Sequence, residues 1–536
     1  MAVNSTGSSS TGLRRGMGPI GLLFAALGGI IGSGWLLGSL SAAQTAGPAA
    51  LISWIIGGLA VLLIALIYAE LGSMFPVAGG VARYPQYSHG SLASFSMGWI
   101  SWLAYVTVAP IEVEAAIQYA SNYLPNLLHT AGGQAVLSPV GYLVAALLML
   151  LFTWINYLGV RSLSLTNSTI TWWKLIIPTL TFLVLLAVSF HGSNLSAQGG
   201  FAPYGLQGIL SAVSTSGIVF SYLGFRQAVE LAGETTNPQR NVPMALIWSV
   251  VIGIVIYFFL QLAFLGALQP GDLAKGWGSL SFTGSFGPFA GIAGTLGLGW
   301  LAVLLYIDAI VSPGGTGLIY TGSTARLSYA MARNGYIPSI FAQINPRTGV
   351  PVFSILFTFI IGLIVFLPFP SWQSLVGFIS SASVMSYGVG PLVLIAMRRQ
   401  DPKRVRPYRL PAGNFWATVG FIVVNLIIYW TGWATDEKLF LAIALGLILF
   451  AISYSGMRSS GKALPKVDWV SGAWIWPYFI GMAIISYLGT FGGGTGFISL
   501  GWSFVVIIIF SLLILWMATA NRLSDAQAAE YIGDLS

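Results

Sequence analysis

Apolar residues gather in long runs along this chain, and short polar segments separate the runs. A membrane-crossing helix needs roughly 20 mostly apolar residues, and about fourteen stretches of the sequence meet that requirement. We predict spans at 17–41, 48–72, 94–120, 138–159, 164–190, 206–229, 243–268, 297–322, 351–369, 373–397, 414–432, 438–456, 470–491 and 497–518. The pattern therefore predicts an all-α polytopic membrane protein.

Composition supports a lipid-facing surface. Hydrophobic residues make up 56% of the 536 positions and charged residues only 7%, whereas soluble domains carry about 25% charged residues. The net charge is +8, but the basic residues lie between apolar spans and form no basic domain, so we expect a lipid bilayer and no nucleic acid as partner. The chain has no cysteine, which excludes disulfides and thiolate chemistry.

Lysine and arginine positions indicate the orientation. With the N-terminus inside, 18 of the 22 basic residues fall on the cytoplasmic side, as the positive-inside rule requires. Lys275 and Lys438 lie outside, and Lys174 and Arg226 remain at membrane depth. An even number of spans puts both termini in the cytoplasm, and we expect a multi-pass protein of the cell membrane.

The same pattern divides the chain into five parts. A disordered cytoplasmic tail at 1–16 is rich in Ser, Thr and Gly, and a ten-helix core occupies 17–400. A basic cytoplasmic loop at 401–413, four additional transmembrane helices at 414–518 and a cytoplasmic tail at 519–536 follow.

Two spans contain small-residue clusters that weaken a helix. The first holds Gly28-Gly29-Ile30-Ile31-Gly32-Ser33-Gly34, and the sixth holds Ser214-Thr215-Ser216-Gly217 and Ser221-Tyr222-Leu223-Gly224. Each glycine costs about 1 kcal/mol in a helix interior. Because the two spans lie five apart, they cross in opposite directions, and matching interruptions then indicate an inverted repeat around a central binding site. We expect the breaks near Gly32 and Gly224, side by side near mid-membrane. Close helix packing through small residues is the alternative.

Several polar motifs follow or close the spans. They are Gly32-Ser33-Gly34, Glu70–Gly80, Asn156–Arg161, Gly233–Pro243 and Ser323–Gly335. In this order and at this spacing the motifs resemble those of the amino acid–polyamine–organocation superfamily over about residues 17–400. The resemblance implies a LeuT-like core, a five-plus-five inverted repeat, with four C-terminal helices added to it.

A narrower similarity extends over nearly the whole chain. The sequence is similar to bacterial aspartate–proton symporters at Arg83–Gly90, Leu305–Gly315, Pro368–Trp372, Tyr429–Trp433 and Ser486–Gly492. This similarity implies a secondary transporter for an amino acid, with a proton as coupling ion and with no enzymatic activity, metal or other cofactor.

The first interruption offers groups for a dipolar substrate. Unwinding there starts a new half-helix at Gly32, Ser33 and Gly34, whose positive end attracts an anion such as an α-carboxylate. The resemblance implies this role for Ser33 and Gly34. It also implies that the free carbonyls of Ile30, Phe220 and Leu223 accept hydrogen bonds from the α-ammonium.

Lys174 and Asp308 are candidates for proton coupling. Lys174 lies about ten residues into the fifth span, where an unpaired ammonium is costly, and some proton-coupled members of the superfamily have a lysine at the matching place. Asp308, half-way along the eighth span, is the natural acidic partner. We expect Lys174 between the first, fifth and eighth spans, within reach of Asp308 or of the first-span carbonyls. The alternatives are snorkelling of Lys174 to the inner interface and a structural ion pair that never titrates.

Glu112 and Glu114 follow Pro110 in the third span. Two residues correspond to about 200° on a helix, so one side chain is expected to face the bundle and the other an external vestibule. The symporter similarity favours Glu112 as the inward residue. Either carboxyl is a proton relay or a hydrogen-bonded structural acid.

Arg226 departs from the superfamily pattern, which usually has an acidic residue there. An arginine would repel a cationic side chain and favour an anionic one, with bidentate pairing available. A salt bridge to Glu230, four residues on along the same helical face, is the alternative.

These residues together predict a secondary transporter that imports an amino acid with a proton and favours aspartate or glutamate. The alternatives are an exchanger or carrier of neutral amino acids, and a membrane sensor that binds an amino acid without moving it. No phosphate-binding loop of the kind found in primary pumps is present. The sequence leaves the oligomeric state open.

Overall fold

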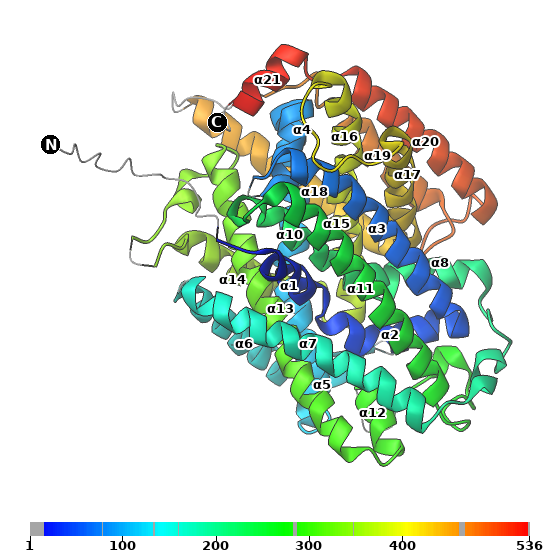
Figure 1. The fold of residues 1–536 in the computed structure, drawn as a ribbon. Helices are drawn as coiled ribbons and strands as arrows, with labels where there is room; N and C mark the ends of the chain where they lie inside the picture. Colours follow the sequence, from blue (N-terminus) through cyan, green and yellow to red (C-terminus); the bar gives the residue numbers. More distant parts are fainter. Residues whose placement is uncertain are drawn as a thin grey trace.

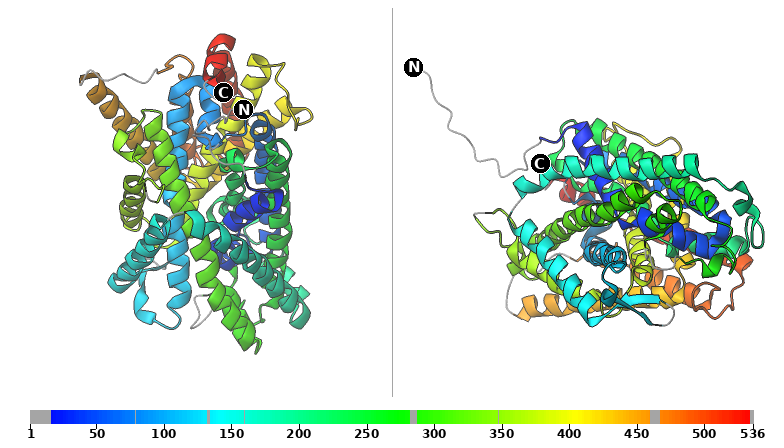
Figure 2. Two further views of the ribbon diagram at one scale, coloured as in Figure 1. Left: turned by 60° about the vertical axis from the view of Figure 1, so that its left-hand side comes forward. Right: turned by 90° about the horizontal axis from the view of Figure 1, so that it is seen from below.

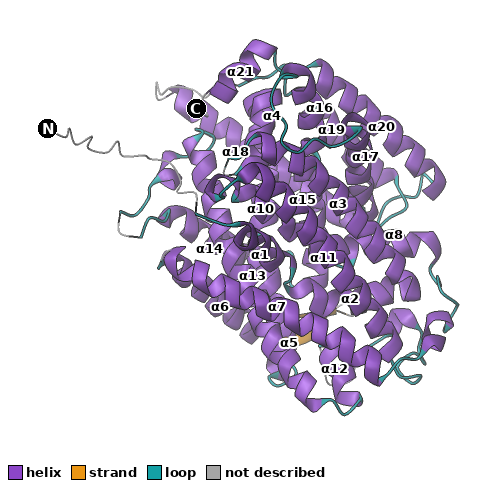
Figure 3. Ribbon diagram, in the orientation of Figure 1, coloured by secondary structure: helices purple, strands orange, loops and turns teal. Residues whose placement is uncertain are grey.

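Helices account for nearly all of the regular structure (Figure 3). The computed structural model describes residues 16–77, 79–131, 134–158, 160–281, 287–346, 348–459 and 467–533. Almost all of the predicted N-terminal tail, residues 1–15, falls outside these ranges. Between α5 (Val108–Ala120) and α6 (Pro139–Tyr157) the antiparallel strands β1 (Leu128–Ala131) and β2 (Gln134–Leu137) form a short hairpin.

The predicted ten-helix core is built from helices α1 to α16. They are α1 (Pro19–Ile30), α2 (Ser33–Ala46), α3 (Ala50–Met74), α4 (Gly80–Val106), α5 (Val108–Ala120), α6 (Pro139–Tyr157), α7 (Val160–Val188), α8 (Gly205–Thr215), α9 (Ile218–Tyr222), α10 (Gln227–Glu230), α11 (Pro238–Ala267), α12 (Pro288–Thr295), α13 (Gly299–Arg333), α14 (Val352–Val365), α15 (Trp372–Tyr387) and α16 (Val389–Gln400).

The four additional spans are single helices. They are α17 (Gly413–Thr431), α18 (Trp433–Ser459), α19 (Ile475–Leu488) and α20 (Leu500–Ala520), and the short α21 (Asp525–Gly533) follows them. Each of the predicted spans overlaps a helix or an interrupted run of helices. Among the described residues ten helical stretches are long and apolar enough to cross a membrane, and the bent pair formed by α8 and Ile218–Glu230 makes an eleventh. Three shorter apolar helices, α1, α14 and α19, lie in further predicted spans.

Burial separates the central helices from the lipid-facing ones. The most apolar window of α15–α16 is 100% buried and that of α4–α5 is 94% buried, whereas that of α18 is only 22% buried. Exposed leucines such as Leu143, Leu147 and Leu150 follow one face of α6, at the spacing of a helix surface. An apolar face turned outwards is stable only in a lipid environment, so α6 and α18 lie at the bilayer boundary.

The interrupted first and sixth spans lie inside the bundle. α1 packs against α7, α11 and the turn at Leu223–Arg226, and α2 packs against α8 and α9. α3 and α11 run beside each other, and so do α5 and α13 (Figure 1). Figure 2 shows the same bundle from the side and end-on, with α21 at the end where α16 finishes. The two interruptions therefore lie where several helices converge.

Two helices extend beyond the predicted apolar segments. α4 begins at Gly80 and not near 94, with a kink at Gly90 where φ is +80°. α13 continues to Arg333, so the polar motif at Ser323–Gly335 is mostly helical. Apolar length predicts only the part of a helix that crosses the membrane, and both extensions are rich in polar residues. In the predicted C-terminal tail, α21 packs on α4.

A buried carboxylate links the additional helices to the core. Asp436 in the first turn of α18 is fully buried, and its two oxygens accept hydrogen bonds from Ser381 Oγ of α15 at 3.2 Å and from Ser486 Oγ of α19 at 2.8 Å. Because a buried carboxylate needs such donors, α15, α18 and α19 are held in one relative position.

A second buried carboxylate holds the basic loop. Glu70, near the end of α3, receives Nε and Nη2 of Arg398 at 3.0 and 2.6 Å, and Arg406 Nε approaches its Oε1 to 3.4 Å. The backbone N–H of Leu410 adds a bond of 2.8 Å. This bidentate arrangement fixes the predicted loop at 401–413 against the ends of α3 and α16.

Candidate substrate and coupling site

The first span is interrupted at Gly32, as the sequence predicts. α1 ends at Ile30 and α2 begins at Ser33. A Cβ atom on Gly32 would lie 2.5 Å from Oε1 of Glu112 and 2.9 Å from Oγ1 of Thr316. A side chain there would displace the carboxylate of Glu112 and the hydroxyl of Thr316, so glycine lets both groups approach the backbone where the helix breaks.

The sixth span is distorted over a longer stretch than predicted. We expected the break near Gly224, and that residue does lie in a 3-10 turn, Leu223–Arg226. The larger bend, of 44°, separates α8 from α9. It falls at Gly217, where φ is +83°, a conformation that glycine adopts without steric cost. Both small-residue clusters of this span therefore interrupt the helix.

The two interrupted spans are in direct backbone contact. A Cβ atom on Gly29 would lie 3.1 Å from Cα of Gly224, and one on Gly224 would overlap the backbone of Gly29. A Cβ atom on Gly34 would likewise overlap Oγ of Ser221. The prediction that the two breaks lie side by side is confirmed.

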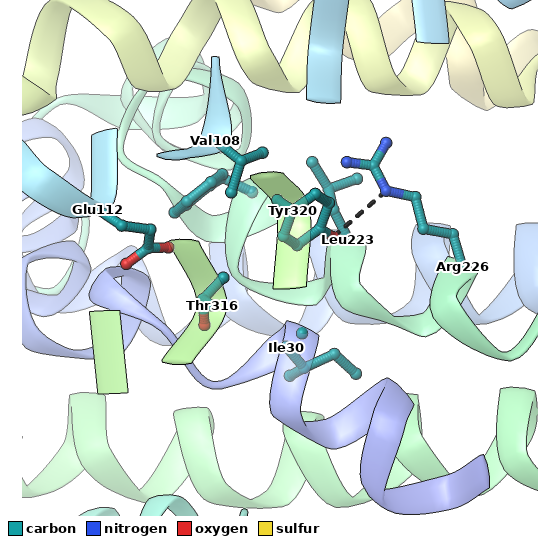
Figure 4. Close-up of a pocket in the computed structure, with 9 residues that line it drawn as sticks. Ile30, Val108, Glu112, Leu223, Arg226, Thr316 and Tyr320 are labelled. Atoms are coloured by element: carbon teal, nitrogen blue, oxygen red, sulfur yellow. Dashed lines mark hydrogen bonds between the residues drawn. The ribbon is translucent and has the colours of Figure 1, made fainter. Parts of the chain in front are cut away.

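A small pocket lies between the two breaks and helices α5 and α13 (Figure 4). Five of its lining residues belong to the predicted site: Ile30, Phe220, Leu223, Arg226 and Glu112. The remaining ones are Gly29, Val108, Thr316 and Tyr320. Gly32, Ser33 and Gly34 continue from its edge into α2 but do not line it. In Figure 4 Glu112 and Arg226 stand at opposite ends of the pocket, with Tyr320 between them.

Lys174 reaches the broken end of α1. Its buried Nζ donates to the carbonyl of Gly28 at 2.7 Å and to Oγ1 of Thr316 at 2.8 Å. The C-terminal end of a helix carries partial negative charge, so an ammonium is well placed there. The predicted position between the first, fifth and eighth spans is confirmed, and the snorkelling alternative is wrong because the side chain is fully buried.

Of the two partners expected for Lys174, the first-span carbonyl is confirmed, whereas no ion pair with Asp308 is formed among the described residues. Oδ1 of Asp308 accepts hydrogen bonds from Nε1 of Trp173 at 2.8 Å and from Oγ of Ser312 at 2.6 Å. Neutral donors on α7 and α13 thus hold the carboxylate, while the ammonium turns to the helix end. A coupling role for Asp308 stays a prediction without the proposed contact.

Glu112 binds the other side of the same break. Its Oε2 accepts the backbone N–H of Ser33 at 2.8 Å, at the positive N-terminal end of α2. Glu112 is therefore the inward residue of the pair, as expected. Glu114 is 3% exposed, so the prediction that it faces an external vestibule is wrong for this conformation.

In the described part of the chain, no three His, Asp or Glu side chains gather to hold a metal ion.

Arg226 is buried without an acidic partner. Its Nε donates to the hydroxyl of Tyr320 at 3.3 Å, and neither Nη has a hydrogen-bond partner among the described residues. The guanidinium carbon lies 3.7 Å from the ring centroid of Tyr105, a cation–π distance. Glu230 instead accepts the hydroxyl of Tyr105 at 3.1 Å, so the alternative of a salt bridge between Arg226 and Glu230 is wrong.

Comparison with known proteins identifies the family. The sequence model of the family described as amino acid permease matches residues 17–452. The chain belongs to the amino acid permease family. It is a multi-pass membrane transporter and not an enzyme, and its substrate class is a small molecule of the amino acid type.

Two relatives of this permease in Bacillus subtilis (strain 168) align over nearly their full length. The glutamate/serine transporter AimA is 41% identical over 526 residues, covering 97% of this chain and 96% of the relative. The aspartate-proton symporter is 38% identical over 519 residues, covering 97% and 99%. The methylthioribose transporter of the same organism is 28% identical over 420 residues, covering 76% and 86%.

Two polar residues of the permease pocket, Thr316 and Tyr320, are absent from the predicted site, although α13 contains a signal for them. Asp308, Ser312, Thr316 and Tyr320 follow one another at intervals of four residues, which places them on one face of a helix. The structure turns this face towards Lys174, the first break and Arg226 in turn. A polar stripe along an otherwise apolar span is the pattern that predicts a ligand-facing side.

Aromatic groups close the permease site. Nε1 of Trp372, at the start of α15, donates to Oγ of Ser33 at 2.9 Å, and its ring lies edge-on to Phe220 with centroids 6.3 Å apart. The hydroxyl of Tyr257 donates to the carbonyl of Ile30 at 2.8 Å. Ser33 and the carbonyl of Ile30, which the sequence predicts as substrate-binding groups, thus have protein partners in this conformation.

Proposed function

We propose that this permease imports an acidic amino acid, aspartate or glutamate, together with a proton. The observation that carries the proposal is the guanidinium of Arg226, which is buried at one end of the pocket with both Nη groups unpaired. A buried cation with unused donors is costly and attracts an anionic group. An acidic side chain supplies that group.

The substrate is held by its common groups at the two breaks. The α-carboxylate binds at the N-terminal end of α2, beside Ser33 and Gly34, where the helix dipole favours an anion. The α-ammonium binds at the carbonyls of Ile30, Phe220 and Leu223, in the place that the hydroxyl of Tyr257 now occupies at Ile30. The side chain then extends across the pocket towards Arg226.

The names of two relatives support this substrate class. One is called a glutamate/serine transporter and the other an aspartate-proton symporter, and both are similar to this permease over almost all of its length. An acidic substrate, with a small neutral amino acid as a weaker one, agrees with both names and with the charge of the pocket.

Lys174 is the proposed proton carrier. Its ammonium holds the carbonyl of Gly28 and the hydroxyl of Thr316, so it stabilises the broken end of α1. When the ammonium loses its proton, the carbonyl loses a charged donor and the interruption is less firmly held. A proton therefore performs the function that a bound sodium ion has in sodium-coupled members of the superfamily.

Glu112 connects this proton to substrate binding. Its carboxylate already occupies the N–H of Ser33, and the substrate's α-carboxylate must approach the same helix end. Two carboxylates at one site repel each other. The positive charge of the protonated Lys174 offsets this repulsion, and we propose that proton and substrate enter the site together for that reason.

The positions of basic residues support a cell-membrane location with both termini in the cytoplasm.

The test of the function is uptake by proteoliposomes of the purified permease under an inward pH gradient, with a panel of labelled amino acids. We expect aspartate and glutamate to be concentrated most, serine less, and arginine least, without a requirement for sodium. Binding without flux would indicate a sensor, and flux only against internal amino acid would indicate an exchanger. Either result would refute proton-driven import.

A further inference from the structure

Arg226 presents unused hydrogen-bond donors to a closed, largely apolar pocket. The residue is 0% exposed, and Nη1 and Nη2 lack partners among the described residues. Besides Tyr105, the rings of Tyr320 and Tyr387 lie 4.9 and 5.7 Å from its guanidinium carbon. Aromatic faces attract a cation, but they do not satisfy N–H donors that a guanidinium directs in its own plane.

The carboxylates around this cation are engaged elsewhere. Glu230 receives the Tyr105 hydroxyl, and Glu112, at the far end of the pocket, receives the N–H of Ser33. Neither carboxylate lies within 4.0 Å of Arg226 in the part of the chain that the structure describes. The guanidinium therefore faces the pocket without a carboxylate in direct contact with it, and Glu230 is the nearby negative charge beyond the ring of Tyr105.

The charge of Arg226 affects the binding of acidic and of neutral amino acids differently. Aspartate or glutamate brings a side-chain carboxylate that pairs with Arg226. Serine brings only a hydroxyl, so the buried guanidinium still has no anion beside its two Nη groups when serine is bound, which is unfavourable. A neutral substrate needs a separate negative charge at the same place.

We propose that Arg226 forms a binding site for a small monovalent anion, with chloride as the test ion, which is occupied when the pocket holds a neutral amino acid. The site rests on the acidic-substrate function proposed above. Serine with one chloride then presents the same charge to Arg226 as aspartate alone. The anion and an acidic side chain are mutually exclusive, because both use the free Nη donors.

Two consequences follow for transport. Serine uptake should depend on chloride, with an apparent affinity about tenfold higher when chloride is present, as expected for one charge-assisted pair. Aspartate uptake should not require chloride, and high chloride should weaken it competitively. A general effect of salt on the protein would instead change both substrates in the same direction.

The test uses proteoliposomes of the full-length permease in which gluconate, an anion too bulky for the closed pocket, replaces chloride at constant ionic strength. Valinomycin with equal potassium on both sides holds the membrane potential at zero, so that chloride cannot act through a diffusion potential. Initial rates of serine and aspartate uptake are measured over a range of chloride concentrations, and bromide is a second small anion. Chloride-independent serine uptake would overturn the anion site, even if aspartate remained the preferred substrate.

Variants locate the effect at Arg226. Arg226→Gln should transport serine without chloride dependence, and Glu230→Gln should raise the apparent affinity for chloride because a nearby negative charge is removed. Arg240→Gln, an exposed arginine on α11, is the matched control and should keep the wild-type chloride response. If Arg226→Gln does not fold, the opposite effects of chloride on serine and aspartate in the wild type still decide the question. Chloride dependence that persists in a folded Arg226→Gln protein would show that the anion binds elsewhere and would refute the assignment.

Discussion

Lys174→Ala should convert this permease from a concentrating carrier into an exchanger. In the wild type the ammonium makes two short hydrogen bonds, to Gly28 O at 2.7 Å and to Thr316 Oγ1 at 2.8 Å. Alanine removes both bonds and the titratable group. Thr316 Oγ1 remains 3.2 Å from the same carbonyl, so a neutral donor can still hold the broken end of α1. The substrate site should therefore survive while the coupling to protons is lost.

The expected loss of substrate accumulation in Lys174→Ala follows from the free energy of the imposed pH gradient. A pH difference of one unit corresponds to about 1.4 kcal/mol per proton. This free energy supports about tenfold accumulation of a substrate that enters together with one proton. Without a proton site, the internal and external concentrations should become equal. Loss of one charge-assisted hydrogen bond to a binding element, worth roughly 1.5–3 kcal/mol, should also weaken substrate affinity.

The assay compares two kinds of flux in proteoliposomes. Accumulation of labelled aspartate under a pH gradient should fall to equilibrium in Lys174→Ala, while counterflow against internal aspartate should remain measurable. Lys438→Ala is the control, since this exposed lysine only lies over the ring of Phe369 at 4.8 Å. Full proton-driven accumulation by Lys174→Ala, or a strict sodium requirement in the wild type, would refute the reasoning.

Two further predictions concern the packing that supports the site. Gly224→Ala should strongly lower the thermal unfolding midpoint in detergent, because the methyl group overlaps the backbone of Gly29, whereas Gly314→Ala, with nothing within 4 Å, should leave it equal or raised. Equal midpoints for the two variants would contradict the close contact of the breaks. Glu70→Gln should cost about 3–5 kcal/mol of stability by leaving Arg398 without its buried partner. An unchanged unfolding midpoint would show that this ion pair does not hold the loop.

The transmembrane plan could be predicted from the sequence because it depends on local properties. Apolar length predicts each span, and the glycines from Gly28 to Gly34 are dense enough to indicate the first break. In the sixth span Gly217 and Gly224 both lie in small-residue clusters, so the sequence does not indicate which of them marks the larger bend. Which of them bends the chain more depends on φ at Gly217 and on the tight contact between Gly224 and Gly29, and both follow from tertiary packing.

Partners of the buried charges could not be derived from the sequence in the same way. Asp308 and the first-span carbonyls are both expected partners of Lys174, and the sequence does not choose between them. The lysine binds a carbonyl of α1, while Trp173 and Ser312 hold Asp308. Helix ends act as partial charges, and their positions are unknown until the helices are placed. For the same reason Glu230, although on the expected helical face, bonds to a tyrosine from α4 and leaves Arg226 unpaired.

The central claim is that Arg226 selects a negatively charged substrate, and uptake by Arg226→Gln tests it most directly. Initial rates for aspartate, serine and arginine are measured side by side for the wild type and the variant, in chloride buffer throughout. The wild type should prefer aspartate, and the variant should lose about tenfold to a hundredfold in aspartate affinity while serine changes little and arginine is no longer excluded. Equal losses for all three substrates, or a wild type that prefers arginine, would contradict the claim.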